Sequence, residues 1–264
     1  MKTTIVRLTM FCLNLIVISL VLAFQSYAKV DLESAAAIWL FDEGKGNEAK
    51  DFTGNGHDVA LNGTEWVDGK FGKSLSFDGA KSNGKTPKTD AFALQDFTVC
   101  FFVNPKAQDE AIVALIDYSH TNCNWVVQSE NAMSTKMWYL GYRGIGEVWQ
   151  VEQPGQVPFT EGKWQHIVFV KADDKMLAYK DGVLVHTRTN ADPKVKYEPY
   201  PLNFGGWYGT SRFFNGILDD VAIFAGALSE ADIKDIATRG LIDAAVVSAS
   251  GKLSIVWATI KVQY

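Results

Sequence analysis

The sequence predicts an all-β protein, a sandwich or barrel of antiparallel strands with one short helix near the C-terminus. Short apolar segments recur along the chain between turns rich in glycine and aspartate, which is typical of strands at hairpin spacing. Asp181-Gly182 joins two of these segments and is the strongest short-range hairpin signal in the chain. Only Glu230–Arg239 has helical periodicity, with Ile233 and Ile236 on one face.

Both ends of this helix carry recognisable signals. Ser229 is a good N-cap, Asp232 three residues later completes a pattern similar to a capping box, and Gly240 stops the helix. The expected strands, in chain order, are Ala35–Phe41, Val59–Trp66, Ser74–Phe77, Phe97–Val103, Ala111–Tyr118, Trp125–Gln128, Lys136–Tyr142, Glu147–Val151, Trp164–Lys171, Lys175–Lys180, Val183–Arg188, Leu202–Gly205 and Ile217–Phe224. After the helix, Ala244–Ser248 and Leu253–Val262 predict a β tail.

The N-terminus has the pattern of a secretory signal peptide. Lys2 and Arg7 precede the apolar segment Leu8–Phe24, and Ser26-Tyr27-Ala28 supplies small residues at the cleavage positions. An uncleaved anchor is the alternative, because the segment is about long enough to cross a bilayer, although Asn14 interrupts it. We expect a signal peptide at 1–28, one domain at 29–240, a β tail at 241–264, and a secreted or cell-envelope mature form with no membrane span.

The charge of the mature chain is acidic. Cleavage after Ala28 would remove Lys2 and Arg7 but no acidic residue, so the formal net charge would change from −5 to −7. An acidic exported domain is a poor candidate for binding nucleic acid or anionic membranes. It is a reasonable candidate for binding divalent cations.

Two cysteines, Cys100 and Cys123, remain after cleavage. A disulfide between them is one expectation in an oxidising compartment. Two free thiols, one in a strand and one in a loop, are the alternative.

Seven segments carry a resemblance to a known family, and they occur in the family's order. These segments are Trp39–Gly46, Asp51–Asp58, Gly72–Gly79, Phe97–Pro105, Gly162–Ile167, Tyr179–Val185 and Phe214–Ser229. They resemble laminin-G-like jellyroll domains of the concanavalin A-like lectin/glucanase superfamily, over most of residues 36–236. The resemblance implies two antiparallel sheets packed as a jelly-roll sandwich.

Catalysis is not indicated by these residues. Glycosidases of the superfamily resembled carry Glu-x-Asp-x-x-Glu on one strand, so that alternate side chains enter one cleft. The nearest segment is Glu147-Val-Trp-Gln-Val-Glu152, which lacks the central aspartate and places its glutamates on opposite strand faces. We therefore expect no enzyme activity. A divergent glycosidase is the weakest alternative.

Three aspartates are candidates for a calcium site. Calcium takes several carboxylate and carbonyl oxygens, and Asp42, Asp51 and Asp219 would converge if the first and last sandwich strands pair. Alternation along Ile217–Phe224 favours Asp219 over Asp220 as the inward carboxylate. The alternative is that Asp51 only forms a turn and Asp42 only ends a strand.

Aromatic residues in the middle of the chain are candidates for stacking on sugar rings. We expect Trp138, Tyr142, Trp149 and Trp207 to bind a glycan, with Trp125 in reserve. Trp138 and Tyr142 are four residues apart and should share one strand face. The function favoured is an exported, non-catalytic, lectin-like module for a polysaccharide or glycan, with calcium as its cofactor. The alternative is a structural or adhesion module for an extracellular protein.

Overall fold

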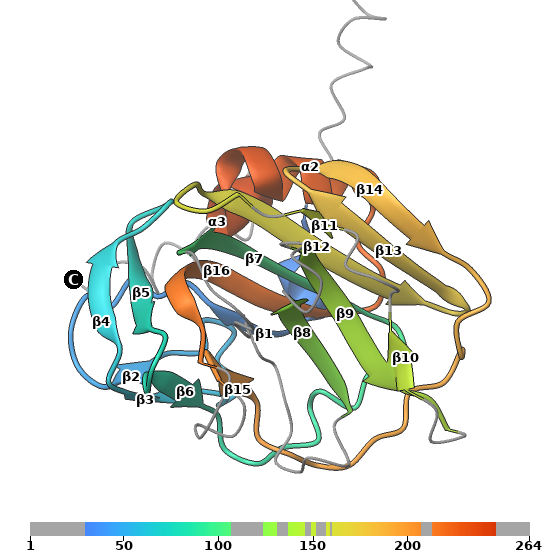
Figure 1. The fold of residues 1–264 in the computed structure, drawn as a ribbon, viewed down its shortest axis with the longest axis horizontal. Coiled ribbons are helices and arrows are strands. Elements are labelled where there is room, and N and C mark those ends of the chain that lie inside the picture. The colour runs from blue at the N-terminus through green and yellow to red at the C-terminus, as the bar shows by residue number, and fades with distance from the viewer. Residues whose placement is uncertain are drawn as a thin grey trace, which may run out of the picture.

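The computed structural model describes residues 30–106, 124–130, 137–145, 149–151, 157–158, 160–206 and 213–246 (Figure 1). The expected signal peptide, the strand at 111–118 and the tail after 246 lie outside these residues. In the described part of the chain, no helix is long and apolar enough to cross a membrane.

One large antiparallel sheet forms a whole side of the molecule. Its strands, in spatial order, are β14 (Val183–Arg188), β13 (Lys175–Lys180), β12 (Gln165–Ala172), β7 (Phe97–Pro105), β16 (Asn215–Ala225), β5 (Lys73–Asp78) and β4 (Glu65–Asp68). The first strand, β1 (Ala35–Trp39), also pairs with β16, with Trp39 opposite Val221. Strand β16, which lies late in the sequence, therefore pairs with the first strand of the domain.

Two four-stranded sheets form the other side of the core. One contains β8 (Trp125–Glu130), β9 (Met137–Arg143), β10 (Trp149–Val151) and β11 (Val157–Pro158). The other contains β2 (Glu48–Ala49), β3 (Val59–Asn62), β6 (Asn83–Lys85) and β15 (Asn203–Phe204). This confirms the expected all-β antiparallel sandwich, with the second layer split into two sheets.

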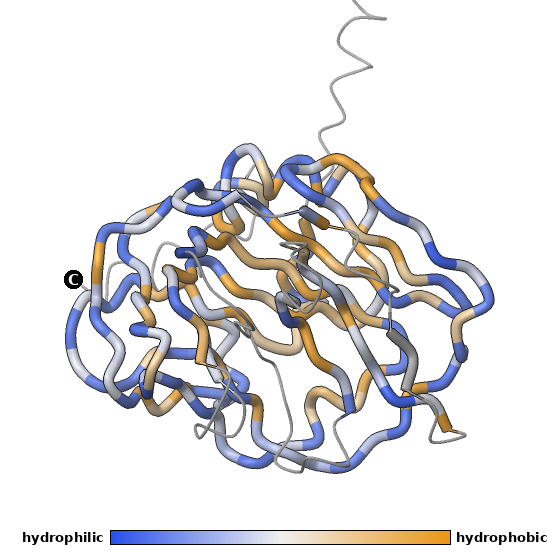
Figure 2. The backbone as a smooth tube through the Cα atoms, in the orientation of Figure 1, coloured by the Kyte–Doolittle hydropathy of each residue, from blue (hydrophilic) through white to orange (hydrophobic). Residues whose placement is uncertain are grey.

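The main core lies between the large sheet and the two smaller ones. Alternate residues of the large sheet, such as Val99, Phe101 and Ile223, pack with Trp138 and Phe204 of the opposite layer. The hydropathy colouring in Figure 2 shows the same interior strands as predominantly apolar. Burial of large apolar side chains contributes roughly 1.5–3 kcal/mol each, so this layer supplies most of the driving force for folding.

A second apolar cluster lies on the opposite face of the large sheet, under two helices. Ile233 and Ile236 of α2 (Glu230–Arg239) and Leu241 and Ala244 of α3 (Leu241–Val246) are buried there with Phe224 and other residues of the sheet. Figure 1 shows both helices at the top of the sheet. A short 3₁₀ turn, η1 (Leu32–Ser34), precedes β1.

Several local predictions are confirmed by backbone geometry. Asp181 and Gly182 both have positive φ, at 50° and 78°, as a two-residue hairpin of type I′ requires. Ser229 accepts a hydrogen bond from the Asp232 amide at 3.1 Å, and Gly240 ends the helix with φ 81°. The prediction of a strand at Ala244–Ser248 is wrong for Ala244–Val246, which belong to α3. Leu241 and Ala244 have helical spacing and pack together on the sheet.

We predict that His166 makes stability pH-dependent. Its imidazole is fully buried beside the Phe102 ring, and among the described residues neither ring nitrogen has a hydrogen-bond partner. Burial lowers the pKa of His166 to about 3. The unfolded chain, with an ordinary histidine pKa of about 6.5, therefore binds the proton more readily. The free energy of unfolding should fall as pH drops from 6.5 towards 3, by up to about 1.4 kcal/mol per pH unit.

Urea unfolding at several pH values measures this slope, and His166→Phe should reduce it. An unchanged slope in that variant would assign the acid sensitivity to other groups.

Candidate functional site

The structure places the expected stacking residues of β9 in the core. Trp138 and Tyr142 share one strand face, as expected, but it is the face that packs against the large sheet, and both side chains are fully buried. The Trp138 ring makes an edge contact with Phe101, and the Tyr142 hydroxyl donates to the Asp192 carbonyl. The prediction that these two rings stack on a glycan is wrong, because neither ring reaches the surface.

Two other expected stacking residues are not placed by the structure. Trp207 lies outside the described residues, and only the backbone of Trp149 is described, paired with Arg143. Their role in binding a glycan stays a prediction. Trp125 is 4% exposed and packs against the Phe97 ring, with 5.2 Å between ring centroids.

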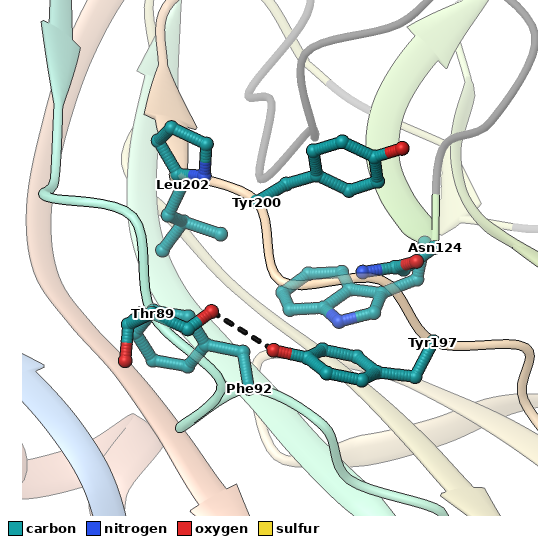
Figure 3. Close-up of a pocket in the computed structure, with 8 residues that line it drawn as sticks. Thr89, Phe92, Asn124, Tyr197, Tyr200 and Leu202 are labelled. Atoms are coloured by element: carbon teal, nitrogen blue, oxygen red, sulfur yellow. Dashed lines mark hydrogen bonds between the residues drawn. The ribbon is translucent and has the colours of Figure 1, made fainter.

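A shallow aromatic pocket lies where Trp125 approaches the surface (Figure 3). Its empty volume is about 260 Å³, including space open to solvent. Three chain segments line it: the loop after β6, the start of β8 and the loop before β15. The lining residues are Thr89, Phe92, Asn124, Trp125, Tyr197, Tyr200, Pro201 and Leu202.

Two tyrosines give the pocket its partly exposed aromatic surface. Tyr197 and Tyr200 are each half-buried, and Figure 3 shows them on opposite sides of the pocket. The Tyr197 hydroxyl donates to the Thr89 carbonyl at 2.9 Å. Partial burial, with the nearby Asp90 and Glu198, raises the pKa of Tyr197 to about 12, so the hydroxyl keeps its proton at neutral pH.

The segment that carries these tyrosines is held by two side-chain amides. Asn124 donates to the Glu198 carbonyl at 2.7 Å and accepts from the Glu198 amide at 2.9 Å. Gln95 makes the same reciprocal pair with the Val195 backbone, at 3.1 and 2.9 Å. Each amide group thereby replaces the hydrogen bonds that a neighbouring strand would supply.

A buried lysine fixes the same segment from below. The Lys171 ammonium donates to the carbonyls of Gln95 and Pro193, at 2.9 and 3.0 Å, and to the Asp96 carboxylate at 3.2 Å. It also lies 5.8 Å from the centre of the Tyr142 ring. A fully buried ammonium is costly unless its donors are satisfied, and here three oxygens satisfy them. The hydrogen bonds of Lys171 therefore fix the backbone of the segment that forms the pocket wall.

The chemistry of the pocket is neutral. No charged side chain is among the eight residues that line it. Aromatic rings offer apolar faces, and the hydroxyl groups of threonine and tyrosine offer hydrogen bonds to a polar ligand. This combination suits a small, uncharged ligand with an apolar face and several hydroxyl groups.

Two adjacent carboxylates form a second feature, on the central strand. A β-bulge between Asp219 and Ala222 interrupts the pairing of β16 with β7, and Asp220 within it has φ 45°. Asp219 lies opposite Phe102, on the helix-covered face, whereas Val221 and Ile223 face the main core. The expectation that Asp219 shares a face with Val221 is wrong, because the bulge shifts the alternation by one residue.

Both carboxylates are buried and hold backbone of other segments. The Asp219 Oδ2 atom accepts from the amides of Lys70 and Phe71, at 2.7 and 2.9 Å. Asp220 accepts from the Leu241 amide, the first of α3, at 3.2 Å. Burial raises the pKa of Asp219 to about 7 and that of Asp220 well above its usual range. Among the described residues, the Asp219 Oδ1 atom has no hydrogen-bond partner.

The loop at 69–72 lies between Asp219 and Asp42. A Cβ atom on Gly69 would collide with the Asp219 carboxylate, and one on Gly72 with the Asp42 carboxylate. Asp42 accepts from the Lys73 amide at 2.7 Å. The antiparallel pairing of β1 with β16 thus brings Asp42 and Asp219 to one end of the sheet, as expected.

Asp51 has a different role from the other two aspartates. Its Oδ1 atom accepts from the amides of Ile38 and Thr53 and from the Thr53 hydroxyl, and its Oδ2 atom accepts from the His57 amide. Within the described residues, no three acidic, histidine or cysteine side chains come together as metal ligands would. The three-aspartate site is therefore not assembled, and Asp51 forms a turn. Calcium binding stays a prediction, and the unpartnered Oδ1 atom of Asp219 is the observation that motivates its test.

The cysteines and glutamates singled out in the sequence have simpler outcomes. Cys100 is buried in β7, and Cys123 lies outside the described residues, so their pairing stays a prediction. Glu147 and Glu152 also lie outside the described residues. Tyr197 and Tyr200 were not among the stacking residues predicted from the sequence. Pro199 and Pro201 were the available signal, because prolines exclude a central strand and leave nearby aromatic residues in a loop.

The fold is a β-sandwich, and it carries one shallow pocket lined by neutral residues in its described part. The family model for the concanavalin A-like lectin/glucanases superfamily matches residues 78–234. The chain belongs to this superfamily, as the sequence resemblance predicted. No curated protein sequence matches the chain.

Several solved structures share the fold. Domain 4 of AbnA, a GH43 extracellular arabinanase from Geobacillus stearothermophilus solved in complex with arabinotriose, has a TM-score of 0.63 and 19% identity, covering 77% of this chain and 98% of that chain. The binding domain of Paraclostridial Mosquitocidal Protein 1 has a TM-score of 0.61 and 15% identity, covering 78% and 52%. The botulinum neurotoxin serotype G binding domain has a TM-score of 0.61 and 12% identity, covering 77% and 50%. The chain thus spans about half the length of these toxin domains.

We predict that calcium stabilises the protein through Asp219. Calcium bound only by the native state raises stability by about 2.7 kcal/mol at 100 times Kd, or very roughly 5–10 °C in Tm for a domain of this size. EDTA should lower the Tm of the wild type. Asp219→Asn keeps an acceptor for the amides of Lys70 and Phe71 but removes the charge, so it should abolish the EDTA effect.

The exposed Asp68, which pairs with Lys73 at 2.7 Å, supplies the control variant Asp68→Asn, which should keep the wild-type response. A wild-type Tm that EDTA leaves unchanged, with no metal by elemental analysis, would contradict this prediction.

Proposed function

We propose that this chain is an exported, non-catalytic module that binds a neutral glycan in the pocket formed by Tyr197, Tyr200 and Trp125. The observation that carries the proposal is an uncharged aromatic pocket whose wall is fixed by Asn124 and Gln95. Preorganisation favours binding, because little side-chain or loop entropy is then lost when the ligand arrives.

The structural relatives support the class of ligand. Domain 4 of the arabinanase was solved with a bound trisaccharide, and the toxin domains are named as binding domains. Identity below 20% establishes only the shared fold, and a fold hosts many functions. The proposal therefore rests on the pocket of this chain, with the relatives as support.

We predict that Tyr200 contributes to glycan binding through its ring. Calorimetry of the mature protein against neutral oligosaccharides, including arabino-oligosaccharides, should detect binding. Tyr200→Ala should weaken it by roughly 5- to 150-fold, which corresponds to about 1–3 kcal/mol. Tyr200→Phe keeps the ring and is the matched control, so it should retain most of the affinity.

Two results would contradict the proposal. If neither neutral nor acidic glycans bind, the proposed glycan-binding function is wrong. Chromatography of the incubated glycans would detect any release of shorter sugars. Such release would instead favour the divergent glycosidase, with catalytic residues outside the described pocket.

Export is part of the proposal, and the sequence of the N-terminus supports it. We predict that the protein purified from its natural source begins at or near Lys29. N-terminal sequencing measures this directly. An intact Met1 in a membrane fraction would favour the uncleaved anchor.

A protein-adhesion module is the second candidate function. The observation that favours it is the exposed apolar edge of β14, where Val183, Leu184 and Val185 are consecutive. Such an edge is a common place for protein contact.

A further inference from the structure

Half of the side chains that line the pocket are aromatic. These four are Phe92, Trp125, Tyr197 and Tyr200, and we call them the aromatic quartet. They come from three segments that are far apart in the sequence, so they reach the pocket from more than one direction. Figure 3 shows Tyr197 and Tyr200 on opposite sides of the space, with Phe92 close to Tyr197.

The two inner rings of the quartet are supported from behind by the core. Trp125 is almost fully buried, and its ring centroid lies 5.2 Å from that of Phe97. Phe92 is also almost fully buried, and its ring centroid lies 5.2 Å from that of His57 and 6.3 Å from that of Trp39. These contacts limit the movement of both rings.

The two outer rings are restricted in other ways. The Tyr197 hydroxyl donates to the Thr89 carbonyl at 2.9 Å, which fixes the direction of its ring. Tyr200 stands directly before Pro201, and the residue before a proline has a restricted backbone. The quartet therefore loses little conformational freedom when a ligand enters the pocket.

The charge around the quartet is negative. Asp90 and Glu198 each directly follow a lining residue in the sequence, and both are exposed. Both carboxylates lie near enough to the Tyr197 hydroxyl to raise its pKa. In the described part of the chain, neither Lys88 nor Lys196, the lysines that adjoin the lining segments, lines the pocket. The electrostatic field at the pocket therefore favours a cationic ligand and disfavours an anionic one.

Aromatic rings bind one class of cation particularly well. The face of each ring is negative, so it attracts a positive charge placed over it. A primary ammonium is a compact and strongly hydrated ion, which makes its transfer out of water costly. A quaternary ammonium carries methyl groups in place of N–H donors, so it loses no hydrogen bonds of its own on entering an aromatic pocket. Aromatic cages are a common site for such ions.

The size of the pocket suits one small group. Its empty volume of about 260 Å³, with open space included, is below the roughly 300–1,000 Å³ of pockets that hold drug-sized ligands. A trimethylammonium group is much smaller than such a ligand. Pro201 and Leu202 complete the lining with apolar surface for its methyl groups.

We propose that the aromatic quartet binds a quaternary ammonium group, with Asp90 and Glu198 supplying the complementary charge. This is a second class of ligand for the same pocket, so it stands whether or not a neutral glycan binds there. Two sources could present the group: a soluble cation such as choline, or a choline head group displayed on a lipid surface.

Calorimetry of the mature protein with choline chloride, at constant ionic strength, tests the proposal. Choline should bind at least tenfold more tightly than 3,3-dimethyl-1-butanol, which has nearly the same shape but no charge. Tyr200→Leu keeps an apolar side chain but removes the ring, so it should weaken choline binding at least fivefold. Tyr200→Phe keeps the ring and should retain most of the affinity.

A second pair of variants tests the contribution of charge. Asp90→Asn removes one carboxylate beside the pocket and should weaken choline binding two- to fivefold. The matched control is Asp68→Asn on β4, which should leave the affinity unchanged. An unchanged Tm in each variant shows that the domain stays folded.

Vesicles of phosphatidylcholine distinguish the two sources of the group. Sedimentation of the protein with these vesicles, lost in Tyr200→Leu, would assign a head group on a lipid surface. Binding of free choline without binding of vesicles would assign a soluble cation.

Three results would overturn the proposal. One is equal affinity for choline and the uncharged alcohol, which would leave only an apolar contact. Another is choline binding that a folded Tyr200→Leu variant retains in full, which would place the cation elsewhere. The third is the absence of choline binding in the millimolar range. If a neutral oligosaccharide still binds in that case, the proposed glycan-binding function stands alone.

Discussion

Burial of two adjacent carboxylates on the central strand is the constraint on which much of the structure depends. Asp219 holds the loop at 69–72, and Asp220 holds the first amide of α3. An ionised carboxylate in an apolar environment costs several kcal/mol unless hydrogen bonds or a cation compensate it. The bulge places both groups on the helix-covered face, where backbone amides of distant segments can reach them. The layer of helices and the sheet are thereby joined by polar contacts as well as by apolar packing.

The sequence could predict most of the fold because its signals are local. The Asp181-Gly182 hairpin, the capped helix at Glu230–Arg239 and the alternating strands each follow from short-range stereochemistry. The β-bulge was not predictable, because nothing local in Leu218-Asp219-Asp220-Val221 shows that one residue is extra. One inserted residue reverses every later face assignment on a strand, which explains why Asp219 was assigned to the wrong side.

The candidate site was harder to predict than the fold. Trp138 and Tyr142 are spaced so that they share one face of a strand, but this spacing alone does not show whether that face is exposed to solvent. Leu140 between them completes an apolar face, whereas Gly141 and Arg143 belong to the other one, so the pattern favoured the core. The pocket residues Tyr197 and Tyr200 lie in a loop, where periodicity carries no information. Their positions depend on Asn124, Gln95 and Lys171, which are distant in sequence.

The pairing of β1 with β16 has a consequence for how the chain folds as it emerges from a ribosome or a membrane pore. Ile38 lies opposite Ala222, so the first strand cannot pair until its partner has been synthesised, more than 180 residues later. The centre of the large sheet stays open until then, and non-local pairing of this kind is slow. An incomplete chain therefore exposes apolar strands for the whole period of synthesis. Passage through a translocation pore in an unfolded state, which the proposed export requires, is compatible with this order of events, because β16 is the last strand of the described residues and closes the large sheet.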